Sequence, residues 1–281
     1  MSDFKQERVL ITGSAGSIGS ALARKIAELK PRAIFLLDNN ESGLFELQQE
    51  LKNVVPIIAS IRDEENLGDI FKKYRPSLVF HCAAYKHVPL MEEHPLEALK
   101  TNIGGTFNLI HEAIVNGVER FIFISTDKAV KPNSIMGQTK KLCERMCKIA
   151  NTFSKTRFIV VRFGNVMASR GSVVSIFQKQ ITENRPLTIT DAKMRRYFMG
   201  IYDAVELILV AAESRSGDMF LLDMGEPKYV VDIAKEMLAL SGKNLPIKFI
   251  GARKGEVLFE RLHDPDHEKT KKKGKRLIEI L

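Results

Sequence analysis

Cysteine is scarce in this sequence of 281 residues, which contains only Cys82, Cys143 and Cys147. An odd and low number excludes a framework of disulfides and favours a reducing compartment, so we expect a cytoplasmic protein. Cys143 and Cys147 lie four residues apart on an expected helix, and no pair of His or Cys residues nearby completes a zinc site. We therefore expect both thiols to pack in the interior, and we predict no metal.

Long apolar runs are absent as well. No stretch of the sequence approaches the about 18 consecutive apolar residues that cross a membrane as a helix. The N-terminal residues reach an expected strand by Arg8, and no signal peptide is recognisable before it. The sequence predicts no membrane span in this chain.

Acidic residues are outnumbered by basic ones, and the formal net charge is +9. The stretch EKTKKKGKR, from Glu268 to Arg276, holds six basic residues and one acidic residue. Such a run can mark contact with nucleic acid or an anionic membrane. No aromatic RNA-binding motif or zinc-finger spacing accompanies it, so we expect a solvated tail and no nucleic-acid partner.

Short apolar runs alternate with helical patterns in the first half of the chain. The runs are rich in Val, Ile and Phe, which is typical of strands buried on both faces of a sheet. They cover residues 9–12, 33–38, 54–59, 78–82, 121–125 and 158–162. Helical patterns cover residues 17–30, 41–52, 64–74, 95–116 and 136–153. The alternation predicts an α/β fold, a Rossmann-type doubly wound parallel sheet.

The alternation ends near residue 165. Helices are expected at 172–184, 202–214 and 230–241, with short strands at 220–223 and 247–250. We expect residues 1–165, with a return segment at about 200–224, to form the dinucleotide-binding domain. Residues 166–199 and 225–281 are expected to form a smaller C-terminal lobe that closes over the end of the sheet and binds the substrate.

Three glycines follow the first expected strand at intervals of three residues. Gly13 permits a tight turn, Gly16 lets the backbone approach a pyrophosphate, and Gly19 lets the helix pack close to the strand. The start of that helix offers free N–H groups and the positive end of its dipole to phosphates. The spacing and its setting between strand and helix predict a dinucleotide site.

An acidic residue completes this motif. Asp38 ends the second expected strand, nineteen residues after Gly19. A carboxylate there accepts hydrogen bonds from the adenosine ribose and repels a 2′-phosphate. Asn39 and Asn40 follow, with no arginine to pair a phosphate, so the sequence predicts NAD rather than NADP.

Six later motifs occur in order along the chain. They are AAYKHVPLME from Ala83, KTNIGGT from Lys100, STDKAV from Ser125, RFGNV from Arg162, RYFM from Arg196 and GARKGE from Gly251. With the glycine spacing, they resemble the polysaccharide-biosynthesis UDP-N-acetylglucosamine 4,6-dehydratases, a group of extended short-chain dehydrogenase/reductases. The resemblance runs from about residue 8 to about residue 262 of this sequence.

Met136 is a branch marker within that resemblance. One branch of the family has a tyrosine four residues before the position of Lys140 and inverts C5 of the sugar. Another branch, often anchored to a membrane through an extra N-terminal region, has methionine there and retains C5. The resemblance thus implies retention at C5, and it leaves open whether this chain corresponds to the soluble domain of a membrane-anchored enzyme.

The resemblance also implies which residues bind the ligands. Relatives usually have an Asp for the adenine amino group where this chain has Ser60, so adenine contacts depend on Ser60 and backbone groups. Besides the glycines and Asp38, the residues expected to contact NAD are Ser14, Ser17, Ile18, Asn39, Ser60, Ile61, Ala83, Ala84, Lys86, Asn102 and Lys140. Those expected to contact the UDP-sugar are Lys86, Asn165, Arg196, Arg253 and Glu256. Guanidinium groups suit phosphate oxygens, and Glu256 suits a ribose.

The implied reaction removes water across C5 and C6 of a nucleotide-linked N-acetylhexosamine and oxidises C4 to a ketone. Asp127 is expected to act as the general acid for the 6-hydroxyl, and Lys128 as the base at C5. These roles need a raised pKa at Asp127 and a lowered pKa at Lys128. Burial shifts both pKa values in these directions, whereas the attraction between the two groups opposes both shifts.

Lys140 lies four residues after Met136, on the same face of the expected helix. It is expected to hold the nicotinamide ribose and to place positive charge beside the 4-hydroxyl. A thioether does not accept a proton near neutral pH, so Met136 is not the base. Thr126 or Ser125 is expected to hydrogen-bond the 4-hydroxyl.

Two other functions stay open: a C4 or C5 epimerase of nucleotide sugars, and a non-catalytic NAD-binding regulator in which Met136 marks lost catalysis. The presence of Asp127 and Lys128 argues against a simple 4-epimerase, which needs neither an acid at C6 nor a base at C5. Together with Lys140 they also argue against the regulator. Relatives pair two long helices across a two-fold axis, so the helices at 95–116 and 136–153 predict at least a dimer.

Overall fold

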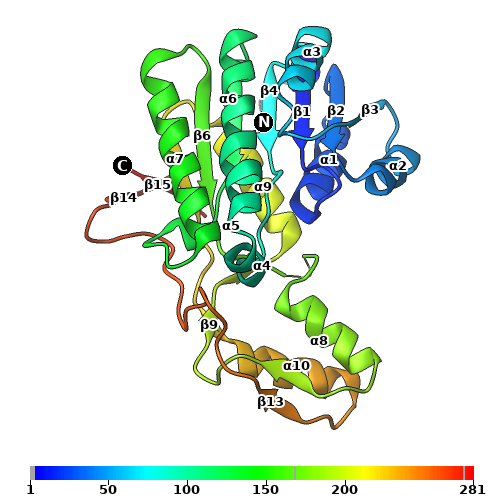
Figure 1. The fold of residues 1–281 in the computed structure, drawn as a ribbon, viewed down its shortest axis with the longest axis vertical. Helices are drawn as coiled ribbons and strands as arrows, with labels where there is room; N and C mark the ends of the chain where they lie inside the picture. Colours follow the sequence, from blue (N-terminus) through cyan, green and yellow to red (C-terminus); the bar gives the residue numbers. More distant parts are fainter. Residues whose placement is uncertain (1–3, 168, 275) are drawn as a thin grey trace.

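The computed structural model describes residues 4–167, 169–274 and 276–281. Within these residues the centre is a nine-stranded sheet in the order β14-β15-β11-β6-β5-β4-β1-β2-β3 (Figure 1). Strands β1 to β6 and β11 run parallel to one another. Their bounds are β1 Arg8–Thr12, β2 Ala33–Asp38, β3 Val54–Ile58, β4 Leu78–His81, β5 Arg120–Ile124, β6 Arg157–Arg162 and β11 Met219–Leu222.

The central strands are buried on both faces. In β1, Val9 and Ile11 belong to the core on one face and Leu10 to the core on the other. The first core includes α1 (Ser17–Glu28), α2 (Glu41–Glu50) and α9 (Ile201–Glu213). The second includes α3 (Glu64–Tyr74), α6 (Gly105–Val115) and α7 (Ile135–Phe153). The predicted doubly wound α/β fold is confirmed, because continuous apolar runs supply side chains to both cores.

The helix expected at 95–116 is divided. After α4 (Val88–Glu93), the short helix α5 (Pro95–Ala98) leads into a π-helical segment, Leu99–Gly104, and only then into α6. Wide turns of this kind are frequent at functional sites. Asn102 lies in the segment, and its amide hydrogen-bonds both the backbone N–H and the backbone carbonyl of Tyr85. The segment therefore holds the loop after β4 in place.

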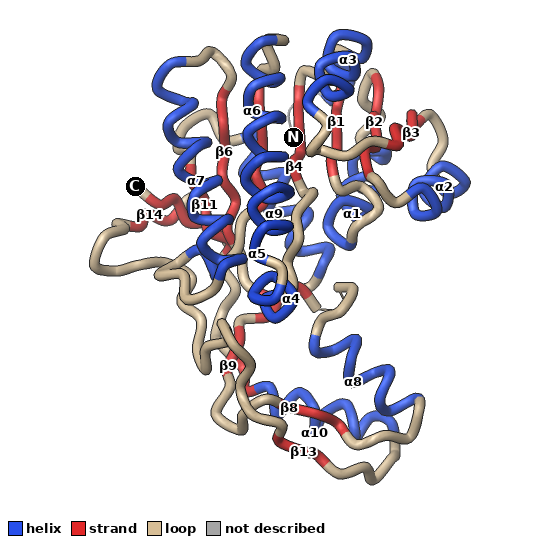
Figure 2. The backbone as a smooth tube through the Cα atoms, viewed as in Figure 1, coloured by secondary structure: helices blue, strands red, loops and turns tan. Residues whose placement is uncertain are grey.

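A smaller lobe lies beyond the carboxyl ends of the parallel strands, at the bottom of Figure 2. Its strands β8 (Leu187–Ile189) and β13 (Ile247–Phe249) are parallel, and α8 (Val173–Thr182) and α10 (Val230–Ser241) pack beside them. Two short pairs lie nearer the sheet: β7 (Asn165–Val166) with β10 (Phe198–Met199), and β9 (Arg195–Arg196) with β12 (Lys228–Tyr229). The lobe has its own buried core, which includes Phe177, Ile181, Leu187, Ile189, Met194, Val230 and Ala234.

The C-terminal residues differ from their expected place. The sequence assigned 225–281 to the lobe and took the lysine-rich run as a solvated tail, but β14 (Thr270–Lys272) and β15 (Leu277–Ile280) form an antiparallel hairpin beside β11. The physical reason lies in β15, whose Leu277 and Ile280 are buried, while the lysines of the edge strand β14 stay exposed. Exposed lysines on an edge strand also discourage pairing with another chain.

Two further observations concern the described residues only. None of their helices has the length and apolarity needed to cross a bilayer. Likewise, in residues 4–167, 169–274 and 276–281 there is no group of three or more His, Cys, Asp or Glu side chains placed to hold a metal ion.

Candidate active site

A cavity of about 790 Å³ lies between the carboxyl ends of the strands and the lobe. All residues expected in catalysis and in substrate binding line it: Thr126, Asp127, Lys128, Met136, Lys140, Lys86, Asn165, Arg196, Arg253 and Glu256. From the expected cofactor set it is lined by Gly13, Gly16, Ser17, Ile18, Gly19 and Ala84, in addition to Lys86 and Lys140. The residues of that set outside its lining are Ser14, Asp38, Asn39, Ser60, Ile61, Ala83 and Asn102. Their individual roles stay predictions.

The glycine turn forms one wall. Gly13 has a positive φ of 66°, and a side chain there would place its Cβ 2.5 Å from the backbone N of Ala83. A Cβ on Gly19 would lie 2.1 Å from the carbonyl oxygen of Gly13. Both positions therefore require glycine, and α1 can begin directly behind the turn with its first N–H groups unpaired.

An unpartnered polar atom accompanies this turn. Ser14 Oγ is fully buried and has no hydrogen-bond partner in the described part of the chain. Asp38 connects the turn to β2, because its Oδ2 accepts a 2.9 Å hydrogen bond from the N–H of Ala15 and its Oδ1 accepts one from Asn40. The orphaned hydroxyl, the free helix N–H groups and the neighbouring carboxylate fit a dinucleotide, with the pyrophosphate at α1 and a ribose at Asp38.

Three further residues of the expected NAD set lie in two segments: Ser60 and Ile61 follow β3, and Asn102 lies in the π-helical segment before α6. The N–H of Arg62 donates to Ser60 Oγ at 3.2 Å. The buried Ile61 packs where a Cβ on Gly105 would lie, 2.4 Å from its Cδ1, so this glycine allows α6 to approach the loop. Asn102 uses both ends of its amide inside the protein and also donates to Thr139 Oγ1 at 3.0 Å. The structure thus gives Asn102 the task of positioning the loop after β4.

The opposite wall holds a compact ionic cluster. The 3₁₀ turn Asp127–Ala129 follows β5 and directs Lys128 across the cavity. Lys128 Nζ donates to Asp127 Oδ1 at 3.1 Å, to Glu260 Oε2 at 3.0 Å and to Asn165 Oδ1 at 3.4 Å. Arg196 Nε lies 3.3 Å from Glu260 Oε1. Two cations and two carboxylates are therefore held together in a largely buried group.

This cluster answers the question that the sequence left open about the Asp127–Lys128 pair. Burial acts to raise the pKa of Asp127, but the Lys128 ammonium and hydrogen bonds outweigh it, and the pKa is lowered. Burial acts to lower the pKa of Lys128, but the carboxylates of Asp127 and Glu260 outweigh it, and the pKa is raised. The mutual attraction thus exceeds the effect of burial. The resting pair is ionised, with the proton on Lys128 and not on Asp127.

Asp127 has one oxygen to spare. Its Oδ1 accepts hydrogen bonds from Lys128 Nζ and from Thr126 Oγ1, the latter at 2.9 Å. Its Oδ2 is buried and has no hydrogen-bond partner among the described residues. Because Asp127 lines the cavity, Oδ2 is the atom available to a hydroxyl group of a bound substrate.

Met136 and Lys140 differ in their surroundings. Met136 is buried and clusters with Val88, Met91 and Ala98, which agrees with a packing role. Lys140 Nζ lies 4.2 Å from the centroid of the Phe123 ring, and burial lowers its pKa. The ammonium group thus lies on an aromatic face beside the cavity, and its contact with the nicotinamide ribose stays a prediction.

Neighbouring hydroxyl groups are not equivalent. Ser125 Oγ donates to Glu144 Oε1 at 2.7 Å and is therefore engaged with α7. Thr126 Oγ1 donates to Asp127 but retains acceptor capacity. Either Ser125 or Thr126 is expected to hydrogen-bond the 4-hydroxyl of the sugar. Of these two residues, Thr126 is the one whose hydroxyl group also bonds to the ionic cluster.

The expected phosphate-binding cations are engaged to different degrees. Arg196 donates to the carbonyl oxygens of Arg195, Val257 and Leu258 as well as to Glu260, so most of its donors are used within the protein. Arg253 Nη2 is 2.7 Å from Glu256 Oε1, and the arginine is exposed. Lys86 Nζ donates to the carbonyl oxygen of Arg170 at 2.8 Å. Lys86 and Arg253 are therefore the two more accessible cations.

Sequence reasoning missed Glu260. Glu260 lies four residues after Glu256, the acidic residue that ends the GARKGE motif. The spacing of these two residues alone does not indicate that Glu260 also reaches the site. Only the fold brings Glu260 to Lys128, which precedes it by 132 residues. A partial signal exists in the position of Glu260 within an otherwise apolar run, VLFE, where a buried carboxylate needs a cation.

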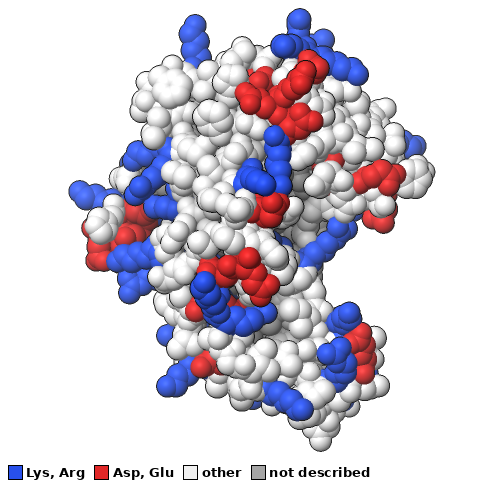
Figure 3. All heavy atoms as spheres, viewed as in Figure 1, with Lys and Arg blue, Asp and Glu red and all other residues white. Residues whose placement is uncertain are grey.

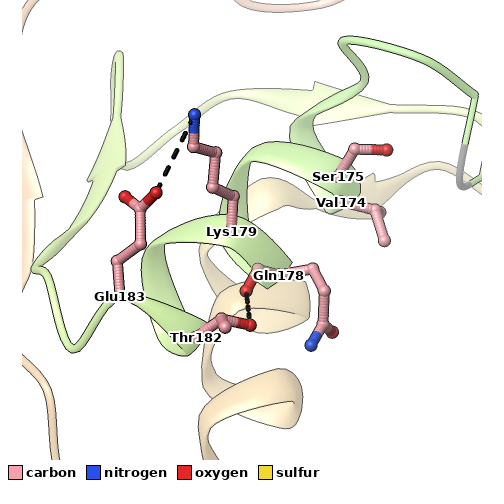
Figure 4. Close-up of a pocket in the computed structure, with 6 residues that line it drawn as sticks. All are labelled: Val174, Ser175, Gln178, Lys179, Thr182 and Glu183. Atoms are coloured by element: carbon pink, nitrogen blue, oxygen red, sulfur yellow. Dashed lines mark hydrogen bonds and ion pairs between the residues drawn. The ribbon is translucent and has the colours of Figure 1, made fainter.

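A second, smaller hollow lies along α8 (Figure 4). Its lining comes from that helix and Glu183 directly after it, and Lys179 Nζ pairs with Glu183 at 3.8 Å. Thr182 Oγ1 donates to the carbonyl oxygen of Gln178. With no second element contributing side chains, this hollow lacks the converging groups of the large cavity.

A glycine turn facing a cavity at the carboxyl ends of parallel strands defines a Rossmann-type dinucleotide-binding protein. Sequence comparison defines it further, since residues 9–280 match the family described as "Polysaccharide biosynthesis protein". The chain belongs to this family, and the resemblance predicted from its motifs is confirmed.

Individual relatives differ in their printed functions. Over 270 residues the chain is 44% identical to "Probable polysaccharide biosynthesis protein EpsC" of Bacillus subtilis, covering 92% of this chain and 45% of that protein. It is 37% identical to a "UDP-glucose 4-epimerase" of Rickettsia bellii, with 92% and 78% covered. It is 35% identical to "UDP-N-acetylglucosamine 4,6-dehydratase (inverting)" of Campylobacter jejuni, with 94% and 79% covered. The chain thus spans about half the length of EpsC.

Among solved structures, Pen from Bacillus thuringiensis is similar with a TM-score of 0.91. The two chains are 33% identical, and the match covers 98% of this chain and 89% of Pen. The likeness extends through both the sheet and the smaller lobe.

Proposed function

We propose that this chain is an NAD-dependent nucleotide-sugar 4,6-dehydratase that converts UDP-N-acetylglucosamine to a UDP-4-keto-6-deoxy-N-acetylhexosamine with retention at C5, in surface polysaccharide or glycan biosynthesis. The observation that carries this proposal is the Asp127–Lys128 pair, buried at the carboxyl end of β5 in the same cavity as the glycine turn. The relative named as a UDP-N-acetylglucosamine 4,6-dehydratase supports the substrate class.

NAD, when bound, supplies a hydride acceptor for C4 and a hydride donor for C6. The glycine turn and Asp38 hold its pyrophosphate and adenosine ribose, and Lys140 holds its second ribose. Lys140 also stabilises negative charge on the 4-oxygen as the hydroxyl releases its proton to water. Lys86 and Arg253 pair with the diphosphate of the sugar nucleotide.

The ketone at C4 acidifies the C5 proton, which Lys128 removes as the free amine. The electron pair of the C5–H bond moves toward C4, and the 6-hydroxyl leaves as water after Asp127 donates a proton to it. The Lys128–Asp127 hydrogen bond of 3.1 Å allows the proton taken from C5 to reach Asp127. Since Lys128 rests as an ammonium, one proton must leave it before this sequence begins.

An epimerase is the second candidate, favoured by the relative named as a UDP-glucose 4-epimerase. One assay separates the functions: incubation with UDP-N-acetylglucosamine followed by NMR of the sugar. We expect a 4-keto-6-deoxy product with its original C5 configuration. A new epimer would support the epimerase, and unchanged substrate would support the non-catalytic regulator. Protein carrying Lys128→Ala is the matched control for contaminating activity.

We further propose that the chain assembles at least as a dimer through α6 and α7. Exposed apolar side chains lie on these helices: Phe107 and Val115 on α6, and Leu142, Ile149 and Phe153 on α7. Figure 3 shows a mostly uncharged area over the part of the molecule where α6 and α7 lie in Figure 1.

We also propose that the chain is located in the cytoplasm and forms the soluble domain of a membrane-anchored enzyme.

A further inference from the structure

Glu260 has no assigned task, yet it is one of the most buried carboxylates in the described residues, with 6% of its surface exposed. Its Oε2 accepts from Lys128 Nζ at 3.0 Å, and its Oε1 lies 3.3 Å from Arg196 Nε. Arg196 is itself fixed by the carbonyl oxygens of Arg195, Val257 and Leu258. Glu260 therefore has a set orientation, with one oxygen directed at Lys128.

The charges around Glu260 come from two elements. Lys128 and Asp127 belong to the turn after β5, and Arg196 belongs to β9. Burial raises the pKa of Glu260 to about 7, against the attraction of Lys128 and Arg196, while Asp127 adds to the rise. The pKa of Asp127 is lowered in the same cluster. Of the two carboxylates bonded to Lys128, Glu260 is thus the more basic one.

We propose that Glu260 is a positioning residue of the proton-transfer site, which accepts the ammonium proton of Lys128 along their 3.0 Å hydrogen bond and so leaves the free amine that the C5 step needs. This inference rests on the proposed 4,6-dehydration. It supplies the step that the Asp127–Lys128 pair lacks, because Asp127, whose pKa is lowered in the cluster, is the weaker acceptor for the ammonium proton.

The transfer from Lys128 to Glu260 balances within the cluster. One N–H bond of Lys128 breaks, one O–H bond forms on Glu260, and nitrogen keeps the electron pair. The net charge of the four groups does not change, so solvent is not required. Lys128 then takes the proton from C5 and passes it through Asp127 to the departing hydroxyl, while Glu260 keeps its proton. Lys128 recovers that proton and returns it to C5 of the product, and a proton from water, equal to the one that the 4-hydroxyl released, restores the ammonium.

The pH dependence follows with a definite sign. Glu260 must be ionised to accept the proton, and its pKa is raised to about 7. Activity is therefore full above that pKa and falls as the pH drops through it. One pH unit below the pKa, about a tenth of the carboxyl groups are ionised, so the rate should be lower by about tenfold.

The first test measures the conversion of UDP-N-acetylglucosamine by Glu260→Gln between pH 5.5 and 9. Glutamine keeps a hydrogen-bond acceptor for Lys128 but takes no proton. We expect kcat to fall on the order of 10²-fold with KM near its wild-type value. The decrease in activity below about pH 7, the acid limb of the pH profile, should disappear. Glu260→Asp should recover part of the rate and the limb. Retained NAD content and thermal transition verify folding.

Glu268→Gln is the matched control, since Glu268 is a largely buried carboxylate paired with buried Arg162 outside the cavity. It should keep the wild-type pH profile. An unchanged limb in Glu260→Gln, or a loss confined to KM, would overturn the inference, because a purely structural ion pair or a substrate contact predicts those results.

The second test does not depend on activity. In protein labelled at the glutamate carboxyl carbon, NMR titration should reveal one carboxyl that titrates near pH 7, absent from Glu260→Gln and present in Glu268→Gln. Absence of that signal from the wild type would overturn the inference. Wild-type protein that leaves UDP-N-acetylglucosamine unchanged would instead refute the proposed function, whereas the carboxyl titration tests the ionisation of Glu260 independently of that outcome.

Discussion

Arg162 and Glu144 form an ion pair in the interior, with Arg162 Nη2 2.8 Å from Glu144 Oε2 and side-chain exposures of 0% and 4%. The arginine ends β6, and the glutamate lies on α7. Arg162 Nη1 also pairs with Glu268 at 2.9 Å, and Glu144 accepts from Ser125 beside the active site. The pair therefore joins the sheet, α7 and the C-terminal segment at one point.

The first prediction concerns this pair. Glu144→Ala should lower the free energy of unfolding by about 3–5 kcal/mol, because the Arg162 guanidinium is left buried with only Glu268 as its anionic partner. Denaturant unfolding measures the change. Glu50→Ala removes an exposed pair with Arg24 and should change stability by less than about 1 kcal/mol. Equal losses in the two variants would contradict the account.

The second prediction concerns the residue at the tyrosine position. Met136→Leu should keep much of the dehydratase activity, since the two side chains have similar volumes and the site around Met136 is apolar. Product formation from UDP-N-acetylglucosamine, measured by NMR, checks this. A folded, NAD-containing Met136→Leu protein as inactive as Lys128→Ala would show that methionine has a chemical task.

The third prediction separates the acid from the base. Asp127→Asn and Lys128→Ala should each lose activity on the order of 10²-fold or more. Exchange of the C5 proton with solvent deuterium should stop in Lys128→Ala. In Asp127→Asn exchange should continue while loss of the 6-hydroxyl is blocked. Exchange lost in Asp127→Asn but kept in Lys128→Ala would reverse the two assignments.

The fourth prediction concerns cofactor choice. The wild-type protein should bind NAD more tightly than NADP, and Asp38→Asn should reduce this preference because the charge that repels a 2′-phosphate is removed. Fluorescence titration with both dinucleotides measures it. Asp232→Asn is the control, since Asp232 lies in the first turn of α10, in the smaller lobe. Tighter binding of NADP by the wild type would refute the role of Asp38.

The fifth prediction concerns assembly. Light scattering should give at least twice the 31.7 kDa chain mass, and Ile149→Lys with Phe153→Lys should reduce it to one chain mass. Charges in a buried apolar contact are costly to desolvate. Leu240→Lys on α10, where the leucine is 89% exposed, should leave the mass unchanged. A wild-type mass near 31.7 kDa at every concentration would eliminate the dimer.

The sequence predicted those features that depend on neighbouring residues. The strands of the parallel sheet follow from continuous apolar runs such as Phe121–Ser125, and the glycine turn follows from a spacing of three. What it did not predict depends on partners far along the chain. Glu260 acquires its position only when the lobe meets the turn after β5, and the strand at Thr270–Lys272 forms only because β15 offers it a paired edge. The sequence also could not predict that the pKa of Lys128 is raised, because the direction of the shift depends on how many carboxylates the fold brings close to the ammonium group.

The lobe is assembled from two stretches of chain that are not contiguous. β8 pairs with β13 some sixty residues later, and the intervening chain passes back through α9 and β11 of the sheet layer. Such distant pairing loses chain entropy when the long loop closes, and this loss is smaller once the ordered sheet holds the two stretches near each other. Folding should therefore proceed from sheet to lobe, and the cavity wall contributed by the lobe should be the last to form and the first to exchange its amide hydrogens.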